Sequence, residues 1–389
     1  ACFSVFSCSY ALTPKTDFGQ IYFLGDSLTD SGFIDNYAQG LKKHGAFTDI
    51  IERDVPFSNP KRIAVNWTWA NWLVSMYNTE YPGSNFESIP NNIHNSVSEN
   101  CVTNTLKGNN FAQGGAVIDG TGLGMGNCFQ PLSLSQQIQH FVQTKKSAIV
   151  ASGKPPLIII WAGSNNFIRA LGIPGVTGPI NQNPTIPYEH FANSFVSNVK
   201  NLQKELGTKA YIMIIGLPNI ADTPLYHKTA IQYPTFNEAV TTDIQKFNTT
   251  IKDGLAGKDL LYFDTFELMN DTIQKVEHSP NQMYNYAIHV NGVTYQVALS
   301  HPYEAACIAP ITTALVCNST IAKTKKSYIF SDIVHPMSQM HEILAAKMLE
   351  AFMPTLAEES KTCDNNTPAV SESLTTETLS FNTEVLDWL

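Results

Sequence analysis

The sequence predicts an α/β fold in which a central parallel sheet carries helices on both faces. Short runs of apolar residues recur along the chain, and segments with helical spacing lie between them. Runs that are apolar throughout are typical of strands buried on both faces, as in parallel sheets. Because strands and helices alternate, each helix is expected to cross over between neighbouring strands. Ligands bind at the carboxyl ends of such strands, so functional residues are expected at that edge.

The predicted strands share a composition. Each is short and mainly apolar, is enriched in β-branched or aromatic side chains, and ends at a polar residue or a glycine. They are residues 20–25, 156–163, 210–216, 260–264 and 327–330.

Helices are predicted where apolar residues recur three or four positions apart. In one segment Phe195, Val199 and Leu202 share a face, and Phe191 precedes them at the same spacing. In another, Pro336 stands just before the helical pattern begins, a position that proline favours in the first turn of a helix. The predicted helices are residues 191–206, 235–251 and 337–352.

One domain, residues 17–353, is predicted, with an additional segment at each end. Of the 389 residues 43% are hydrophobic and 15% are charged, which is enough apolar material for a large core. Residues 40–108 and 270–326 interrupt the alternation and are expected to be long loop insertions, where substrate-binding surfaces are often built. Residues 1–16 are interpreted either as the remnant of an export signal or as a frayed terminus. Residues 354–389, rich in Ser, Thr and Glu, are predicted to be a mobile tail.

The net charge of −9 argues against nucleic acid as a partner and against electrostatic adhesion to anionic membranes. It leaves a lipid substrate open, because an apolar groove can hold one. No run reaches the roughly 18–20 apolar residues that a membrane-spanning helix needs, so no integral membrane span is expected. We expect the protein to be a monomer.

The seven cysteines contain no CxxC pair, so a zinc site built from thiolates is not expected. Two pairs stand close together in the sequence, and each could be a local disulfide in an oxidising compartment or two free buried thiols. The odd count leaves at least one thiol unpaired or paired with a terminal cysteine. The pairs are Cys101 with Cys128 and Cys307 with Cys317; the remaining cysteines are Cys2, Cys8 and Cys363.

Polar residues and glycines follow the predicted strands at the edge where ligands are expected. Ser27 follows the first strand, Asn165 follows the second, and Gly114 lies between them after a short segment. Asp332 and His335 follow the last strand. Taken alone, Ser27 is also compatible with ordinary turn chemistry, because Gly, Asp and Ser commonly close strands.

Together these residues meet the needs of acyl transfer through a serine. A neutral imidazole must take the proton of the hydroxyl before Ser27 can attack, and His335 is the candidate. Asp332, three residues earlier, would fix the tautomer of that ring and stabilise its charged form. The backbone N–H groups of Ser27 and Gly114 and the side-chain amide of Asn165 are the candidate donors to the oxyanion. This chemistry requires no metal and no cofactor, so none is expected.

Four short blocks carry a resemblance to a known family. They read GDSLTDSG at 25–32, NNFAQGGA at 109–116, WAGSNNF at 161–167 and DIVHP at 332–336. In this order they resemble the blocks of the GDSL family of SGNH hydrolases. The third block of that family usually reads G-x-N-D, and this chain has Asn166 in place of the aspartate.

The resemblance implies a flavodoxin-like three-layer sandwich with a parallel sheet of about five strands between helices. It also implies site residues, by their match to the blocks. Ser27 would be the nucleophile and Asp332 and His335 its partners, while Gly114 and Asn165 would donate to the oxyanion.

The longer first block and the aromatic-rich insertions resemble the bacterial secreted lipase branch of the family, which comprises lysophospholipases, phospholipases A and glycerophospholipid:cholesterol acyltransferases. Members often carry a cysteine-bounded loop shortly before the last block. By this resemblance, a disulfide loop from Cys307 to Cys317 would restrain access to the site, and an activating protease would cleave it. The resemblance also implies secretion.

Three further features of the sequence are not assigned to the reaction. Two are expected to have structural roles, and the third has two interpretations. Asp26 is expected to order the serine loop rather than to act as a second acid, and His341 is expected to be partly buried. The cluster of Trp67, Trp69 and Trp72 is interpreted as the core of the first insertion or as part of an acyl groove.

The leading functional hypothesis is a secreted serine acyl hydrolase acting on phospholipid or lysophospholipid esters through an acyl-enzyme on Ser27. A sterol could take the acyl group in place of water. The alternatives are a short-chain or carbohydrate esterase on the same fold and, from another class, a non-catalytic binding or adhesion protein.

Overall fold

The structure is a computed structural model, and it describes nine stretches of the chain. The predicted Cys101–Cys128 and Cys307–Cys317 pairs and the tail beyond residue 363 lie outside these stretches. The described residues are 8–14, 19–32, 53–58, 61–64, 67–91, 107–123, 130–257, 260–306 and 327–363.

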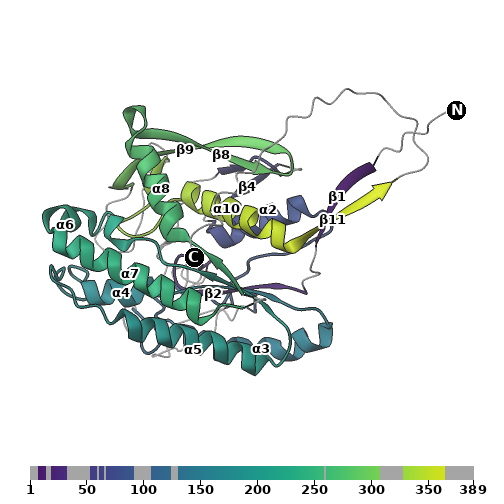
Figure 1. Cartoon of the computed structure of the whole chain (residues 1–389), viewed down its shortest axis with the longest axis horizontal. Helices are drawn as coiled ribbons and strands as arrows, with labels where there is room; N and C mark the ends of the chain where they lie inside the picture. The colour runs from purple at the N-terminus through teal and green to yellow at the C-terminus, as the bar shows by residue number, and fades with distance from the viewer. Residues whose placement is uncertain are drawn as a thin grey trace, which may run out of the picture.

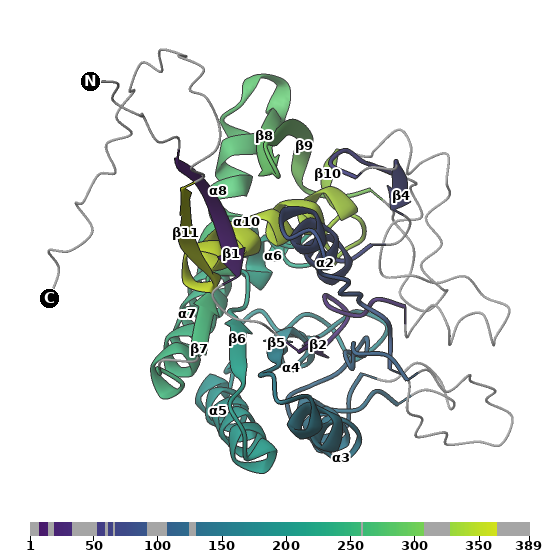
Figure 2. The ribbon, with the colours of Figure 1, turned by 90° about the vertical axis from the view of Figure 1, so that its right-hand side faces the viewer.

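A parallel sheet of four strands forms the centre of the fold, as the apolar runs predicted (Figure 2). Every residue of the two strands next to the serine loop is buried, because helices cover both faces of the sheet. In order across the sheet the strands are β2 (Ile21–Gly25), β5 (Leu157–Trp161), β6 (Tyr211–Ile215) and β7 (Leu260–Phe263).

Residues 109–113 extend this sheet beyond β2. The Phe23 N–H donates to the Asn109 carbonyl at 3.1 Å, and the Phe111 N–H donates to the Phe23 carbonyl at 2.7 Å. The segment therefore runs beside β2 like a further strand. It brings the glycine pair that follows it to the carboxyl edge of the sheet, next to the serine loop.

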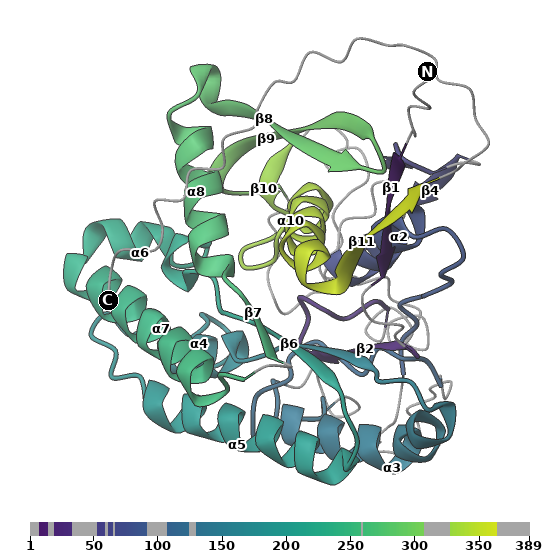
Figure 3. The same cartoon turned by 45° about the vertical axis from the view of Figure 1, so that its right-hand side comes forward.

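The helices form two layers, one on each face of the sheet (Figure 3). Successive strands are neighbours in one direction across the sheet, and right-handed crossovers then place their connecting helices on one face. The predicted helices at 191–206, 235–251 and 337–352 are confirmed. No described helix is long and apolar enough to cross a membrane. One face carries α3 (Leu134–Ser152), α5 (Tyr188–Leu206) and α7 (Pro234–Gly254), and the other carries α2 (Trp69–Glu80) and α10 (Ser338–Leu356).

The predicted last strand belongs to a second sheet, which corrects the sequence interpretation. β10 (Tyr328–Phe330) pairs with β9 (Val293–Ala305), which pairs with β8 (Met283–Val290). A short apolar run indicates burial but not which strand will be its partner. Within 270–326, the described residues 270–306 are thus mainly the end of α8 (Thr265–Glu277), a short 3-10 helix (Pro280–Gln282) and a β-hairpin rather than a loop.

The tryptophan cluster is part of the core. Trp69 and Trp72 lie on α2 and are fully buried, and α2 packs against α10. Trp67 is partly buried against the same core. None of the three lines the cavity described below, so the interpretation as core holds over the acyl-groove alternative.

The two end segments of the chain come together in a two-stranded antiparallel ribbon at one side of the molecule (Figure 1). β1 (Cys8–Pro14) pairs with β11 (Ala357–Cys363). The register runs from Cys8 opposite Cys363 to Pro14 opposite Ala357. The predicted tail therefore begins with the last residues of α10, and a strand follows them.

Candidate active site

Ser27, His335 and Asp332 form a continuous chain of hydrogen-bonded side chains. His335 Nε2 lies 2.7 Å from Ser27 Oγ, and His335 Nδ1 lies 2.7 Å from Asp332 Oδ2. The three residues are only 8%, 7% and 4% exposed, respectively. The fold therefore brings together a serine and a histidine that are 308 positions apart, in a site largely shielded from water.

Asp332 shapes the turn that carries His335. Asp332 Oδ1 accepts hydrogen bonds from the Val334 N–H at 2.8 Å and from the His335 N–H at 2.7 Å. Aspartate commonly caps a turn in this way. The other oxygen, Oδ2, is left to face the imidazole, which explains why a spacing of three residues suits this pair.

The serine loop is held from two sides at the end of β2. A Cβ at Gly25 would lie 2.1 Å from the Trp161 carbonyl oxygen, so only glycine allows this close approach to β5. Gln137 of α3 accepts from the Gly25 N–H at 2.9 Å and donates to its carbonyl at 2.8 Å. These contacts fix the backbone at Gly25, two residues before Ser27. Sequence reasoning overlooked Gln137, because its full burial is evident only in the structure.

Asp26 orders the serine loop, as predicted. Its side chain is fully buried, and Oδ1 accepts from the Leu28 N–H at 3.1 Å. Burial raises the pKa of Asp26 to about 7, opposed by the Leu28 hydrogen bond and by the charge of His335. The carboxyl group is therefore neutral through the acid range.

The prediction that His341 is partly buried is wrong, because this side chain is 1% exposed. It lies on α10, which packs beside α2 and contacts strands of both sheets, and so presents little surface to solvent. Burial, together with the charge of His335, lowers the pKa of His341 to about 3. The ring stays neutral beside the site.

The backbone donors near Ser27 differ from the prediction at one position. The Gly114 N–H donates to Asp30 Oδ2 at 3.1 Å, so it is engaged elsewhere. Among the described residues, the N–H groups of Ser27 and Gly115 have no hydrogen-bond partner, and both residues line the cavity. Asn165 Nδ2 donates one proton to the Ala116 carbonyl at 2.9 Å and has a second to give.

A tight turn explains why the second glycine of the pair matters. The Ala116 N–H donates to the Gln113 carbonyl at 3.0 Å, and Gly115 has φ +81°. These are the marks of a type II turn, whose third residue needs a positive φ and is usually glycine. A Cβ at Gly115 would also lie 2.3 Å from the Leu123 carbonyl oxygen. The two consecutive glycines in the sequence QGGA, residues 113–116, are typical of such a turn.

Asn166 fills the place where the resembling family has aspartate. Its Oδ1 accepts from the Ile118 N–H at 2.9 Å. This contact ties α4 (Ser164–Leu171) to the segment that follows the glycine turn. An amide oxygen meets this need as a carboxylate oxygen would, so the substitution leaves the neighbouring Asn165 in place.

A cavity of about 140 Å³ opens beside the hydrogen-bonded side chains. Ser27, Asn165 and His335 contribute to its lining, but most of its wall is apolar. The apolar residues come from α4, α8 and the loops at the carboxyl edge of the sheet. Examples are Leu123, Ile168, Ile173, Ile220, Met269 and Ile273.

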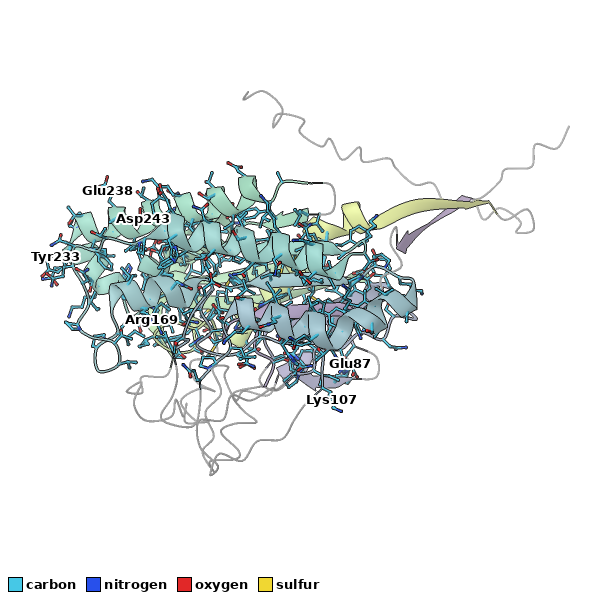
Figure 4. The ribbon with its side chains drawn as sticks, turned by 90° about the horizontal axis from the view of Figure 1, so that it is seen from below. Glu87, Lys107, Arg169, Tyr233, Glu238 and Asp243 are labelled. Carbon is cyan, nitrogen blue, oxygen red and sulfur yellow. The ribbon has the colours of Figure 1, made fainter. Side chains whose placement is uncertain are left out.

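Two polar residues complete this region. Arg169, at the end of α4 (Figure 4), donates to the carbonyls of Thr121 and Gly122 at 2.7 and 3.2 Å and so holds the loop that carries Leu123. Asp222 also lines the cavity, and burial raises its pKa to about 6.

An α/β sheet that carries a Ser–His–Asp chain and free amide donors beside an apolar cavity is the arrangement of a serine ester hydrolase. The sequence profile of the GDSL-like Lipase/Acylhydrolase family matches residues 21–348. The chain belongs to this family.

A plant protein is also similar to this chain. A GDSL esterase/lipase of Arabidopsis thaliana is 24% identical over 268 residues, which cover 63% of this chain and 66% of the relative. The match thus spans just under two thirds of the length of that relative.

Proposed function

We propose that the chain is a lipid acyl hydrolase that works through an acyl-enzyme on Ser27. The apolar cavity beside the Ser27 hydroxyl is the observation that carries this proposal. An acetyl group would leave most of such a cavity without contacts. A longer acyl chain would fill it and remove its own methylene groups from water, at about 0.8 kcal/mol for each CH₂ group.

In the proposed reaction His335 Nε2 takes the proton of Ser27 as Oγ attacks the ester carbonyl. Asp332 holds the ring in the required tautomer and stabilises its positive charge. The carbonyl oxygen becomes an oxyanion, which accepts from the N–H groups of Ser27 and Gly115 and from the Asn165 amide. The ester C–O bond then breaks, and the departing alcohol takes the proton from His335.

The acyl-enzyme is resolved by the same groups. His335 takes a proton from a water molecule as the water attacks the acyl carbon, and the carboxylic acid leaves as Ser27 regains its proton. Phospholipid and lysophospholipid esters are the proposed substrates, and a sterol hydroxyl would react in the same way as water. We also propose that the protein acts outside the cell, on the grounds of its seven cysteines.

The test compares hydrolysis of acetyl, octanoyl and palmitoyl esters and of a lysophospholipid by the wild type and by Ser27→Ala. We expect faster turnover of the longer esters by the wild type and none by the variant, with an unchanged melting temperature. Lipid products measured with and without a sterol separate hydrolysis from transfer. The assays use protein before and after limited proteolysis, because the 307–317 loop is predicted to restrain access.

Three outcomes would contradict the proposal. A preference for acetyl esters would favour the short-chain esterase. Activity retained by Ser27→Ala would remove Ser27 from the mechanism. A wild type that neither turns over an ester nor reacts with a fluorophosphonate, before or after proteolysis, would favour a binding protein.

A further inference from the structure

Asp30 bridges the serine loop and the glycine turn. Its side chain is only 7% exposed, although it carries a carboxyl group. Oδ2 accepts from the Gly114 N–H at 3.1 Å, and Oδ1 accepts from the Gly32 N–H at 3.0 Å. The Asp30 N–H itself donates to the Asp26 carbonyl at 3.1 Å. One buried carboxyl group thus connects two loops that are 84 positions apart in the sequence.

The contact with Gly114 restricts the turn that presents Gly115. Gly114 and Gly115 are the two central residues of the type II turn, so their N–H groups belong to successive peptide planes. Holding the first N–H limits rotation of the turn and therefore the direction of the second N–H. Donors to an oxyanion act through their preorganised position, and a displacement of about 1 Å can cost about 100-fold in rate.

We propose that Asp30 is a positioning residue for ester hydrolysis. It holds the glycine turn so that the Gly115 N–H, rather than the Gly114 N–H, faces the oxyanion. Asp30 is not among the residues that line the cavity, so it acts through Gly114. The inference rests on the proposed function, because it assumes that an oxyanion forms next to Ser27.

A second contact keeps the two loops together when Asp30 is changed. Asn110 Nδ2 donates to the Thr29 carbonyl at 2.7 Å, which joins the segment before the glycine turn to the serine loop. The substitution Asp30→Asn is nearly isosteric, but it offers one acceptor oxygen to two N–H donors. It should therefore loosen the glycine turn without separating the loops.

The experiment compares Asp30→Asn with Asp119→Asn. Asp119 is exposed, lies three positions after the last residue of the same turn, and accepts a hydrogen bond from Asn198. Active sites are counted by end-point labelling with a fluorophosphonate, and kcat is expressed per labelled site. We expect Asp30→Asn to lower kcat by about 10- to 100-fold with KM changed less than about twofold. Affinity for a trifluoromethyl ketone, which mimics the tetrahedral state, should fall in parallel. Asp119→Asn should match the wild type.

The pH profile separates positioning from an electrostatic role. The charge of Asp30 acts on Asp26 and helps to raise the pKa of that neighbour. If Asp30 acted mainly through charge, Asp30→Asn would shift the pH profile and leave the plateau of kcat unchanged. That result, an unchanged kcat, or a loss explained by fewer labelled sites would overturn the inference. An inactive Ser27→Ala beside a fully active Asp30→Asn would reject this inference alone, whereas an active Ser27→Ala would reject the proposed function.

Discussion

At the residue scale, Asp332 performs two tasks with one carboxyl group. Oδ1 is committed to the N–H groups of Val334 and His335, so only Oδ2 remains for the imidazole. The orientation of the carboxyl group is therefore set by the backbone, and the imidazole takes its orientation from the carboxyl group. Because the two oxygens have separate partners, an amide at this position would change only one of these contacts.

Asp332→Asn should inactivate the enzyme without unfolding it. The amide oxygen would keep the two backbone hydrogen bonds, so the NH₂ group would face His335 Nδ1. The ring would then carry its proton on Nε2 and could not accept the proton of Ser27. We expect a fall in kcat of about 10⁴-fold, measured by steady-state kinetics on an ester, with little change in the melting temperature. A fall of less than about tenfold would show that the orientation of the ring does not depend on Asp332.

Asp26 should make stability fall as the pH rises. Its pKa is about 7 in the folded state, above the ordinary value of 3.8 that it has in an unfolded chain. Between about pH 4 and 7 the folded protein retains a proton that the unfolded chain has lost, so the free energy of unfolding decreases with increasing pH. The full effect is on the order of 4 kcal/mol.

Asp26→Asn removes this dependence while keeping an acceptor for the Leu28 N–H. We expect its stability relative to the wild type to be greater at pH 8 than at pH 5, by about 3 kcal/mol. Urea unfolding at the two pH values measures the difference. The same relative stability at both pH values would mean that Asp26 ionises normally in the folded state.

At the scale of single elements, the glycine turn combines a backbone requirement with a steric one. Gly115 and Gly120 both have φ near +80°, at +81° and +85°. A Cβ at Gly115 would meet the Leu123 carbonyl oxygen, whereas a Cβ at Gly120 would have no atom within 4 Å. The two glycines are therefore a matched pair that separates backbone strain from a clash.

Gly120→Ala should lower the free energy of unfolding by about 1–2 kcal/mol, because alanine is strained at a positive φ, and it should keep full activity. Gly115→Ala should cost more than this and lower kcat by about 100-fold or more, because the clash displaces a donor to the oxyanion. Thermal unfolding and kinetics per labelled site give both values. Equal effects of the two substitutions would show that strain alone accounts for the requirement at Gly115.

Elements with a strong local pattern were predictable, and elements that depend on a partner were not. The strands at 20–25 and 156–163 and the helix at 191–206 could be read from apolar spacing because each pattern is local. The β8–β9 hairpin was missed, although Asn291 and Gly292 form its tight turn with positive φ at both positions, a strong hairpin signal. The assignment of β10 to that sheet required knowledge of β9.

At the scale of the whole molecule, the cavity joins residues from the sheet edge, α4 and α8, and its lining includes one exposed apolar side chain. Val176 lines the cavity and is 46% exposed. Val150 is a similar exposed valine on α3, at 54%, and does not line the cavity. These valines allow the proposed acyl site to be tested without disturbing the core.

Val176→Asp should lower kcat/KM for a palmitoyl ester by about tenfold, the equivalent of losing contact with about two CH₂ groups. We expect acetyl ester hydrolysis to change less than twofold, because the loss should be confined to acyl chains long enough to contact Val176. Val150→Asp should leave both rates unchanged. Rates on the two esters provide the measurement, and an equal loss on both would place Val176 outside the acyl site.

The sequence by itself determined the class of fold and identified Ser27, His335 and Asp332, the three side chains that the structure joins by hydrogen bonds. Apolar periodicity is local, and the four blocks placed Ser27, Asn165, Asp332 and His335 after the segments that position them. The tertiary structure alone decided which N–H groups beside the cavity are bonded to other residues, how Asp30 reaches Gly114, and which sheet holds β10. These features depend on contacts between residues that are far apart in the chain, and such contacts form only when the backbone has folded.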